Sequence, residues 1–445
     1  MHNNRYRLNS LLLLVAGLIT MGCGQAQSNG THKSSRYDDS LVLVAIDSSY
    51  DFIRYDTNRL WIGSDSSHMQ HFADKWFQFL ATGEGQLNIL QIGASHIQGG
   101  TFPHRVRCNL LRTVQQAGVP SPIGSRGLIF PYSAAKGCNN PYDYKVRRSR
   151  DLLLTRNVYR EPDCQLGLCG IAVTAANDSA DINILMNEPD FDFATTRILL
   201  MGTAKGGVVP YLRLVAADSS ETIVMPQQVD TVLRHYCYQM PAAVDSFHVM
   251  LPCKEGQSFT ITGLYLYNDQ PGLTFHSIGV NGASTVDYLN KCPYFTTDLK
   301  LVQPDLAIFC IGINDASGSN FDTTIFYQRY QRLIDSVRSV SPDCALLFVT
   351  NNDSSRRLRR RYTTNENAVL AREVFMRLAE ANGGAVWDQF TVMGGLGSMG
   401  KWQTADLAQR DHIHFTRKGY TLLGDLLTNA LYDMLNRLKD RQPKR

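Results

Sequence analysis

The order of apolar and polar residues predicts two kinds of structure, and the first kind consists of buried strands followed by amphipathic helices. Continuous apolar runs such as Leu306–Ile313 and Ala345–Val349 are typical of strands that are covered on both faces. In chain order, the expected strands of this kind are Leu87–Ile92, Leu273–Val280, Leu306–Ile313, Ala345–Val349 and Ala385–Phe390.

The helices that follow these strands are predicted by apolar residues three and four positions apart. For example, Phe326, Tyr330 and Val337 fall on one face of a helix. The expected helices are Phe102–Ala117, one that carries Phe326 to Val337, Asn367–Ala381, and a last one that carries Leu423 to Met434. Strands that alternate with helices predict a parallel sheet covered on both sides.

The second kind of pattern fills Tyr144–Asp269, where helical periodicity is almost absent. Short alternating runs such as Ile182, Ile184 and Met186 are separated by Gly, Pro, Asn and Asp. This pattern predicts an antiparallel β-sandwich. The sandwich is expected as an insertion in the α/β domain, because two successive domains would leave the first strand and helix without the rest of their sheet.

Length and charge narrow the class of protein. The chain has 445 residues, which suits two domains or one domain with a large insertion. Its composition of 44% hydrophobic and 19% charged residues is that of an ordinary globular protein. A formal net charge of only +4 argues against nucleic-acid binding, which requires concentrated basic faces.

The N-terminus predicts export. Two arginines precede an apolar run, Leu11–Ile19, that is too short to span a bilayer and has the length of a signal-peptide core. The run ends near Gly22-Cys23, which is similar to a bacterial lipobox, in which the cysteine becomes the lipid-modified first residue. An ordinary cleaved signal with an incidental cysteine is the alternative. We expect a signal peptide over residues 1–22, a flexible tether over 23–40, and a lipid anchor to the bacterial cell envelope, on the periplasmic or outer-membrane face.

The chain has ten cysteines, so nine remain when Cys23 is set aside, and an odd number leaves at least one unpaired. Export permits disulfides. The candidate pairs are Cys164 with Cys169 and Cys237 with Cys253. Cys310 and Cys344 lie in or beside apolar runs and are expected to be buried thiols. Because no CxxC motif occurs, we expect neither a metal site nor a redox site.

Ser95 follows the first buried strand directly and precedes a helix. Open α/β sheets bind ligands at this end of their strands, and the start of a helix offers backbone N–H groups to a developing oxyanion. Ser95 is therefore a candidate nucleophile. The alternative is a helix N-cap, which is also the interpretation favoured for Ser66 in Gly63-Ser64-Asp65-Ser66.

Asp411 and His414 stand three residues apart before the last helix. At this spacing, the carboxylate can hold Nδ1–H of the imidazole and leave Nε2 facing a serine. His412 is the rival base, although its side chain is expected to point away. A polar loop at the start of the helix is the alternative.

Two further strand ends carry candidate hydrogen-bond donors for an oxyanion. The side-chain amide of Asn314, after the strand that begins at Leu306, is one of them. Gly282, after the strand Leu273–Val280, allows the backbone to approach a ligand and offer its N–H. An Asn-Asp turn is the alternative for Asn314.

Taken together, these segments resemble the four sequence blocks of the SGNH (GDSL-like) hydrolases. The matching segments are Gly93-Ala94-Ser95, Asn281-Gly282, Gly312-Ile313-Asn314-Asp315 and Asp411-His412-Ile413-His414. The resemblance implies that Ser95 is the nucleophile, His414 the base and Asp411 its orienting partner. It also implies an oxyanion hole formed by the N–H groups of Ser95 and Gly282 and the side chain of Asn314. Ala94 replaces the Asp usual in the first block, but that Asp is not a triad member.

The resemblance also implies the fold. We expect an α/β protein with the flavodoxin-like three-layer SGNH fold and a parallel sheet, interrupted by an inserted antiparallel β-sandwich. The expected boundaries are 41–144 for the first part of the hydrolase domain, 145–269 for the inserted sandwich, 270–438 for the second part, and 439–445 for a polar tail.

A narrower resemblance is carried by Gly93–Gln98, Arg126–Tyr132 and Asn139–Tyr144. With the long β-rich insertion, these segments are similar to peptidoglycan O-acetylesterases, in which an inserted β-sandwich resembles a carbohydrate-binding module. We expect His96 and Trp402 to contact the substrate.

The sequence therefore predicts a serine esterase that acts through an acyl-enzyme, without cofactor or metal. The expected substrate is an O-acetylated glycan of the cell envelope, with peptidoglycan as the first choice and another acetylated polysaccharide as the second. An O-acyltransferase, a lipase or thioesterase with the same triad, and a non-catalytic glycan-binding lipoprotein are the alternatives.

Overall fold

The computed structural model describes residues 37, 39–119, 124–138, 141–187, 191–358 and 361–441. The predicted signal peptide, the lipid-modified Cys23 and most of the predicted tether lie outside the described residues, as do Asn139 and Asn140. Within the described ranges, no helix is long and apolar enough to cross a membrane.

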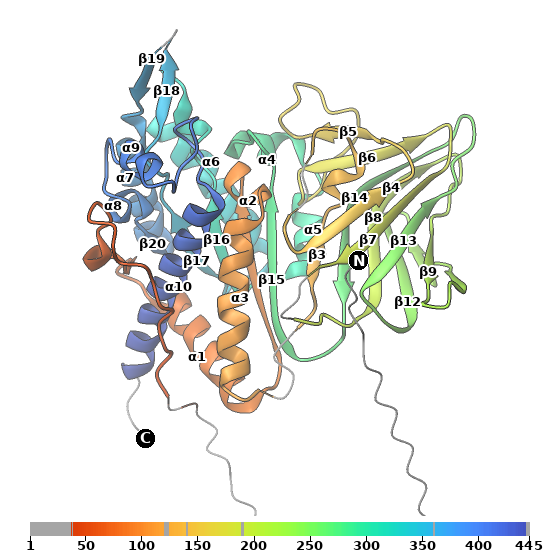
Figure 1. Cartoon of the computed structure of the whole chain (residues 1–445), viewed down its shortest axis with the longest axis horizontal. Helices are drawn as coiled ribbons and strands as arrows, with labels where there is room; N and C mark the ends of the chain where they lie inside the picture. Colours follow the sequence, from red (N-terminus) through yellow and green to blue (C-terminus); the bar gives the residue numbers. More distant parts are fainter. Residues whose placement is uncertain are drawn as a thin grey trace, which may run out of the picture. The chain divides into compact units, whose positions relative to one another are not determined.

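A six-stranded sheet carries the predicted buried strands (Figure 1). Its order is β1-β20-β17-β16-β2-β15, and every pairing is parallel except that of β1 with β20. The strands are β1 (Leu60–Ile62), β2 (Gln86–Gly93), β15 (Gly272–Gly279), β16 (Leu306–Cys310), β17 (Ala345–Val349) and β20 (Ala385–Trp387). The prediction of a mixed α/β fold is confirmed, with β1 as an unpredicted antiparallel edge.

The last of these strands is shorter than expected. β20 ends at Trp387, and Asp388 accepts a hydrogen bond from the N–H of Thr391 and so caps the short helix α8 (Gln389–Val392). Gln389 and Phe390, predicted as strand residues, therefore belong to a helix, because the capping carboxylate stabilises the first turn there.

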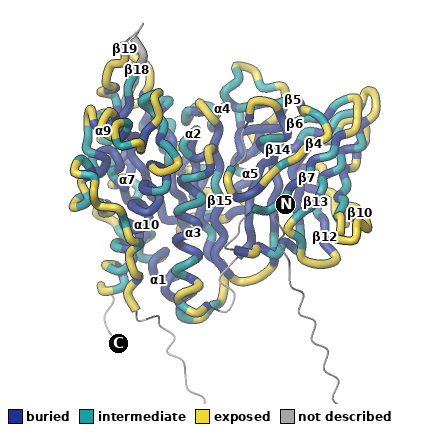
Figure 2. Tube along the Cα trace, in the orientation of Figure 1, coloured by how far each residue is buried: buried dark blue, intermediate teal, exposed yellow. Residues whose placement is uncertain are grey.

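Helices cover both faces of the sheet because successive strand residues point to opposite sides. Leu87 and Ile89 belong to a core with α1 (Ser67–Thr82), α3 (Thr101–Gln116) and α10 (Arg417–Asp440). Leu90 and Ile92 belong to a second core with α5 (Phe295–Val302), α6 (Thr323–Val340) and α7 (Asn367–Asn382). In Figure 1, α3 and α10 run across the near face, and Figure 2 shows long stretches of both as buried.

The order of the parallel strands places their carboxyl ends along one edge. Numbered among themselves, the five parallel strands have the order 2-1-3-4-5, which is that of flavodoxin-like sheets. Ligands of such sheets bind outside the carboxyl ends, where the strand order reverses. Here that point lies between β2, which ends at Gly93, and β16, which ends at Cys310.

Two antiparallel sheets follow between α3 and β15, as the alternating pattern predicts. One has the order β10-β9-β13-β7-β4, and the other β11-β12-β8-β14-β6-β5, with β3 also paired to β14. The strands of the first are β4 (Tyr144–Arg148), β7 (Ala180–Met186), β9 (Tyr211–Val215), β10 (Glu221–Val224) and β13 (Ser246–Leu251). Those of the second are β3 (Gly127–Ile129), β5 (Leu153–Arg156), β6 (Ile171–Ala176), β8 (Thr195–Lys205), β11 (Gln228–Asp230), β12 (His235–Val244) and β14 (Ser258–Tyr267).

The antiparallel sheets begin earlier in the chain than the expected boundary at residue 145. β3 pairs with the end of β14, and the N–H of Leu128 donates to Nδ1 of His276 on β15. β3 therefore links the antiparallel sheets to the edge of the parallel sheet. Side chains of both antiparallel sheets, such as Ile184 and Leu200, share one hydrophobic core.

The expected disulfides are absent, because all nine described cysteines are free thiols. Cys237 lies on β12 of one antiparallel sheet, whereas Cys253 follows β13 of the other. Cys169 is buried in the core, and Cys164 is only partly buried. Cys344 is buried as expected, and Cys310 is partly buried beside a small cavity.

A buried ionic cluster connects α3 to the segments on either side of β3. Asp143 lies 2.9 Å from Nη2 of Arg107 and 2.5 Å from Nη2 of Arg126, and all three side chains are 2% exposed. Burial raises the pKa of Asp143, but the two guanidinium groups outweigh it and hold the pKa well below its usual value. The carboxylate is therefore ionised at neutral pH and compensates two buried positive charges.

Replacing Asp143 tests this cluster. Asp143→Asn should lower the free energy of unfolding by about 3–5 kcal/mol, because two buried guanidinium groups lose their counter-ion. Urea unfolding measures the change. The matched control is Asp433→Asn, since Asp433 and its partner Arg437 are each 42% exposed and the pair should contribute less than about 1 kcal/mol. A cost for Asp143→Asn no larger than that of the control would contradict the role of the cluster.

Candidate active site

Ser95, His414 and Asp411 form one continuous chain of hydrogen bonds. Nε2 of His414 lies 2.7 Å from Oγ of Ser95, and Nδ1 lies 2.6 Å from Oδ2 of Asp411. Because an ionised carboxylate only accepts hydrogen bonds, Nδ1 carries a hydrogen and Nε2 accepts that of the serine hydroxyl. The imidazole is thus oriented to take a proton from Ser95, as in a catalytic triad.

A glycine lets the chain turn from β2 into α2 (Ser95–Gln98), and so places Ser95 at the carboxyl edge. A Cβ atom at Gly93 would lie 2.2 Å from Cγ1 of Ile97 and 2.9 Å from the carbonyl oxygen of Cys310. No larger residue fits this close approach. Ser95 is the first residue of α2 and not its N-cap, which is Ala94. Ser66 does occupy the N-cap position of α1, although its side chain makes no capping hydrogen bond.

Asp411 also holds the backbone of the loop that carries His414. Its Oδ1 accepts hydrogen bonds from the N–H groups of Ile413 and His414, each at 2.9 Å. Partial burial raises the pKa of Asp411, but hydrogen bonds from the backbone and ring of His414 outweigh it and keep the pKa below its usual value. Asp411 is therefore ionised at neutral pH and can stabilise a positive charge on His414.

His412, the rival base, points elsewhere. Its backbone has a φ of +60°, and its ring packs against that of Tyr362, with 4.5 Å between the centroids. The positive φ turns the two histidine side chains of this loop in different directions. His414 is thus the histidine within hydrogen-bond distance of Ser95.

The three expected oxyanion donors lie on loops that contact one another. Nδ2 of Asn314 donates one hydrogen to the carbonyl oxygen of Ala283 at 2.9 Å, which leaves its second hydrogen for another acceptor. Gly282 has a φ of +84°, a conformation that glycine adopts readily. Among the described residues, no acceptor pairs with the backbone N–H of Ser95 or of Gly282.

Two side chains that were given no role from the sequence hold these loops together. Oε1 of Gln98, on α2, accepts a hydrogen bond from the N–H of Asn281 at 2.6 Å. The carboxylate of Asp315 accepts from the N–H of Thr285 at 3.1 Å and from its hydroxyl at 2.6 Å, at the start of α4 (Thr285–Lys291). Gln98 follows Ser95 by three residues and Asp315 follows Asn314, so proximity to the motifs was the only available signal.

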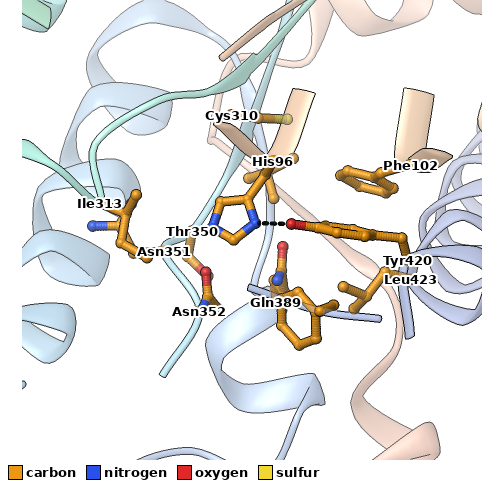
Figure 3. A pocket seen from close by; sticks show the side chains of 12 residues that line it. His96, Phe102, Cys310, Ile313, Thr350, Asn351, Asn352, Gln389, Tyr420 and Leu423 are labelled. Atoms are coloured by element: carbon orange, nitrogen blue, oxygen red, sulfur yellow. Dashed lines mark hydrogen bonds between the residues drawn. The ribbon is translucent and has the colours of Figure 1, made fainter. Parts of the chain in front are cut away.

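His96 packs beside the imidazole of His414. Its Nδ1 is 2.8 Å from the hydroxyl of Tyr420 (Figure 3). Its ring is 5.1 Å from that of His414 between centroids. The ring borders a cavity of about 20 Å³, room for one water molecule. Burial lowers the pKa of His96 to about 3, as does the neighbouring His414, so His96 is neutral at ordinary pH.

The expectation that Trp402 contacts the substrate is wrong. Trp402 lies on α9 (Met399–Thr404), its side chain is fully buried, and its Nε1–H donates to the carbonyl oxygen of Met393 at 2.8 Å. Its ring packs edge-on against Phe52 and Phe415. The apolar surface of an indole ring favours the core when its N–H finds a partner there.

A family model confirms the resemblance inferred from the sequence blocks. Residues 262–422 match the GDSL-like Lipase/Acylhydrolase family. This range includes Gly282, Asn314, Asp411 and His414, whereas Ser95 precedes it. No curated protein sequence matches the chain.

One solved structure, described as "Peptidoglycan O-acetylesterase in action, 5 min", shares the fold, with a TM-score of 0.67 and 20% identity over 85% of this chain and 99% of that chain. The acetyl xylan esterase AlAXEase aligns with a TM-score of 0.28 and 15% identity, over 35% of this chain and 79% of its own. A family two carbohydrate esterase from Cellvibrio japonicus aligns with a TM-score of 0.25 and 11% identity, over 66% and 98%. Only the first similarity is high enough to support the fold.

The buried carboxyl group of Asp315 makes the free energy of unfolding depend on pH. Burial raises the pKa of Asp315 to about 6, against the hydrogen bonds from Thr285. The value in the unfolded chain is about 3.9, so between about pH 4 and 6 the native state binds more protons than the unfolded state. The contribution of Asp315 to the free energy of unfolding therefore falls as the pH rises through this range.

Asp315→Asn should remove this dependence while keeping an oxygen that accepts from Thr285. Relative to the wild type, the variant should gain stability as the pH rises from about 4 to 6, by up to about 3 kcal/mol. Urea unfolding of both proteins at several pH values measures the difference. A difference that stays constant across the range would contradict the prediction.

Proposed function

We propose that this carboxylic ester hydrolase of the GDSL-like type removes O-acetyl groups from a cell-envelope glycan, with peptidoglycan as the first choice. The observation that carries the proposal is the hydrogen-bonded chain Ser95–His414–Asp411, with links of 2.7 and 2.6 Å. Such a chain activates a serine for attack on an ester without a metal or cofactor.

The reaction proceeds through an acyl-enzyme. Nε2 of His414 takes the hydroxyl proton as Oγ of Ser95 attacks the ester carbonyl carbon. The N–H groups of Ser95 and Gly282 and Nδ2 of Asn314 donate to the resulting oxyanion. The carbon–oxygen bond to the sugar then breaks, and the sugar oxygen takes the proton from His414. A water molecule, deprotonated by His414, attacks the acyl-enzyme and releases acetate and the free serine.

One similarity supports a short acyl group on a glycan. The fold is shared over 85% of the chain with a structure described as a peptidoglycan O-acetylesterase. We therefore propose peptidoglycan as the substrate ahead of other acetylated polysaccharides.

The placement of the enzyme and the role of its β-rich part belong to the same proposal. Residues 145–269 would act as an inserted β-sandwich that binds carbohydrate, between the two parts of the hydrolase domain. Cleavage after residue 22 and lipid modification of Cys23 would anchor the exported protein to the cell envelope, with residues 23–40 as a tether. This placement brings the active site to its polymeric substrate.

Acetate release from O-acetylated peptidoglycan and acetylated xylan tests the proposal. The wild type should release acetate, and Ser95→Ala should reduce kcat by roughly 10⁴–10⁶-fold, because the nucleophile is lost. Ser339→Ala removes the hydroxyl of an exposed serine on α6, serves as the matched control and should retain the rate.

Other outcomes would contradict the proposal in distinct ways. Transfer of acetyl groups to a sugar hydroxyl in preference to water would identify an O-acyltransferase. A preference for long acyl chains in a chain-length series would identify a lipase or thioesterase. Identical activity in the wild type and Ser95→Ala would contradict catalysis by Ser95. It would favour a non-catalytic glycan-binding protein.

A further inference from the structure

A two-stranded hairpin, β18 (Ser355–Leu358) and β19 (Arg361–Thr364), projects from the α/β part of the molecule (Figure 1). It is hydrogen-bonded to the loops that carry His414 and Asn314. The N–H of Ser355 donates to the carbonyl oxygen of His412 at 3.0 Å. Nη1 of Arg356 donates to the carbonyl oxygen of Gly318, four residues after Asn314, at 3.1 Å. The hairpin is therefore held in a fixed position relative to both loops.

The loop at Gly318 is itself restrained, so this position is well defined. Nδ2 of Asn367, at the start of α7, donates to the carbonyl oxygens of Gly318 at 2.7 Å and of Ala316 at 3.0 Å. Asn365, just after β19, donates to Ala316 as well, at 3.1 Å. Side chains on both ends of the hairpin thus fasten it to the loop that follows Asn314.

Tyr362 is the exposed aromatic residue of this hairpin. Its side chain is 48% exposed, and its ring packs on the ring of His412, with 4.5 Å between centroids and a tilt of 40°. His412 supports one side of the ring, so the ring is positioned and still accessible. An exposed aromatic ring fixed in this way offers apolar surface at low cost in conformational entropy.

Tyr362 lies against the loop that carries His414, because its ring packs on that of His412. The Cα atoms of His412 and His414 are at most roughly 7 Å apart, because they are two positions apart in the chain. His414 in turn contacts Ser95. A glycan chain several sugar units long, with its ester at Ser95, therefore has the length to reach the tyrosine ring.

We propose that the exposed face of Tyr362 is a stacking platform for a pyranose ring of the glycan substrate. The inference rests on the proposed function and adds the residue that recognises the polymer. The C–H groups of one face of a pyranose form a flat apolar patch, which packs on an aromatic ring, while the hydroxyl groups at its rim remain in water. A small acetate ester has no such ring and would not use the platform.

The test compares a polymeric with a small substrate. Tyr362→Ala should raise KM for the acetylated glycan by about five- to tenfold, the loss expected for one stacking contact. Its kcat on the glycan and its kcat/KM on p-nitrophenyl acetate should stay within about twofold of the wild type, because Ser95, His414 and the oxyanion donors are unchanged. Tyr362→Phe should restore the low KM, since it keeps the ring.

The matched control is Trp61→Ala, which removes another exposed aromatic side chain, 40% accessible on the edge strand β1. It should leave KM for the glycan unchanged. Equal losses on both substrates without rescue by Tyr362→Phe would show that Tyr362 only supports the His412 loop, and the platform would be wrong.

The two proposals fail in different ways. An unchanged glycan KM in Tyr362→Ala, with Ser95-dependent acetate release intact, would overturn the platform and leave the esterase proposal standing. If the wild type hydrolyses p-nitrophenyl acetate but deacetylates no glycan, the proposed glycan substrate is wrong, and the platform is overturned with it.

Discussion

The hydrogen bond between Nε2 of His414 and Oγ of Ser95 joins residues 319 positions apart, and the arrangement of the α/β part serves to form it. Ser95 follows β2, which lies between the edge strand β15 and β16, whereas His414 precedes α10, the helix that packs beside α3 on one face. Neither residue has a catalytic environment by itself. Parallel strands direct their carboxyl ends to the same edge, so a correctly packed sheet is the condition for the site.

The surroundings of His414 at this edge of the sheet favour an ionised Asp411 and a neutral His96. Asp411 is ionised and lies beside the imidazole that, in the proposed reaction, becomes positive. His96, on the other side of that imidazole, is kept neutral by burial and by its neighbour. A second positive charge at His96 would oppose protonation of His414. Gln98 and Asp315 hold the loops that carry the proposed oxyanion donors.

Much of this arrangement could be predicted from the sequence, because buried parallel strands are continuous apolar runs and Asp411 lies at a spacing that binds the ring of His414. The errors have physical causes. Trp402 resembles a sugar-stacking residue in the sequence, but an indole with an internal hydrogen-bond partner packs in the core. The pairing of Cys237 with Cys253 assumes that they flank one hairpin, whereas Cys237 lies on β12 and Cys253 follows β13, a strand of the other antiparallel sheet. Tyr362 was missed because its position depends on contacts between distant loops.

The most direct test of this account is covalent labelling with a fluorophosphonate, which reacts with activated serines, followed by identification of the modified peptide by mass spectrometry. The account predicts a single modified serine, Ser95, with labelling abolished by His414→Ala and slowed by Asp411→Asn. Modification of a different serine, or labelling of Ser95 at an unchanged rate in His414→Ala, would contradict the claim that His414 activates Ser95.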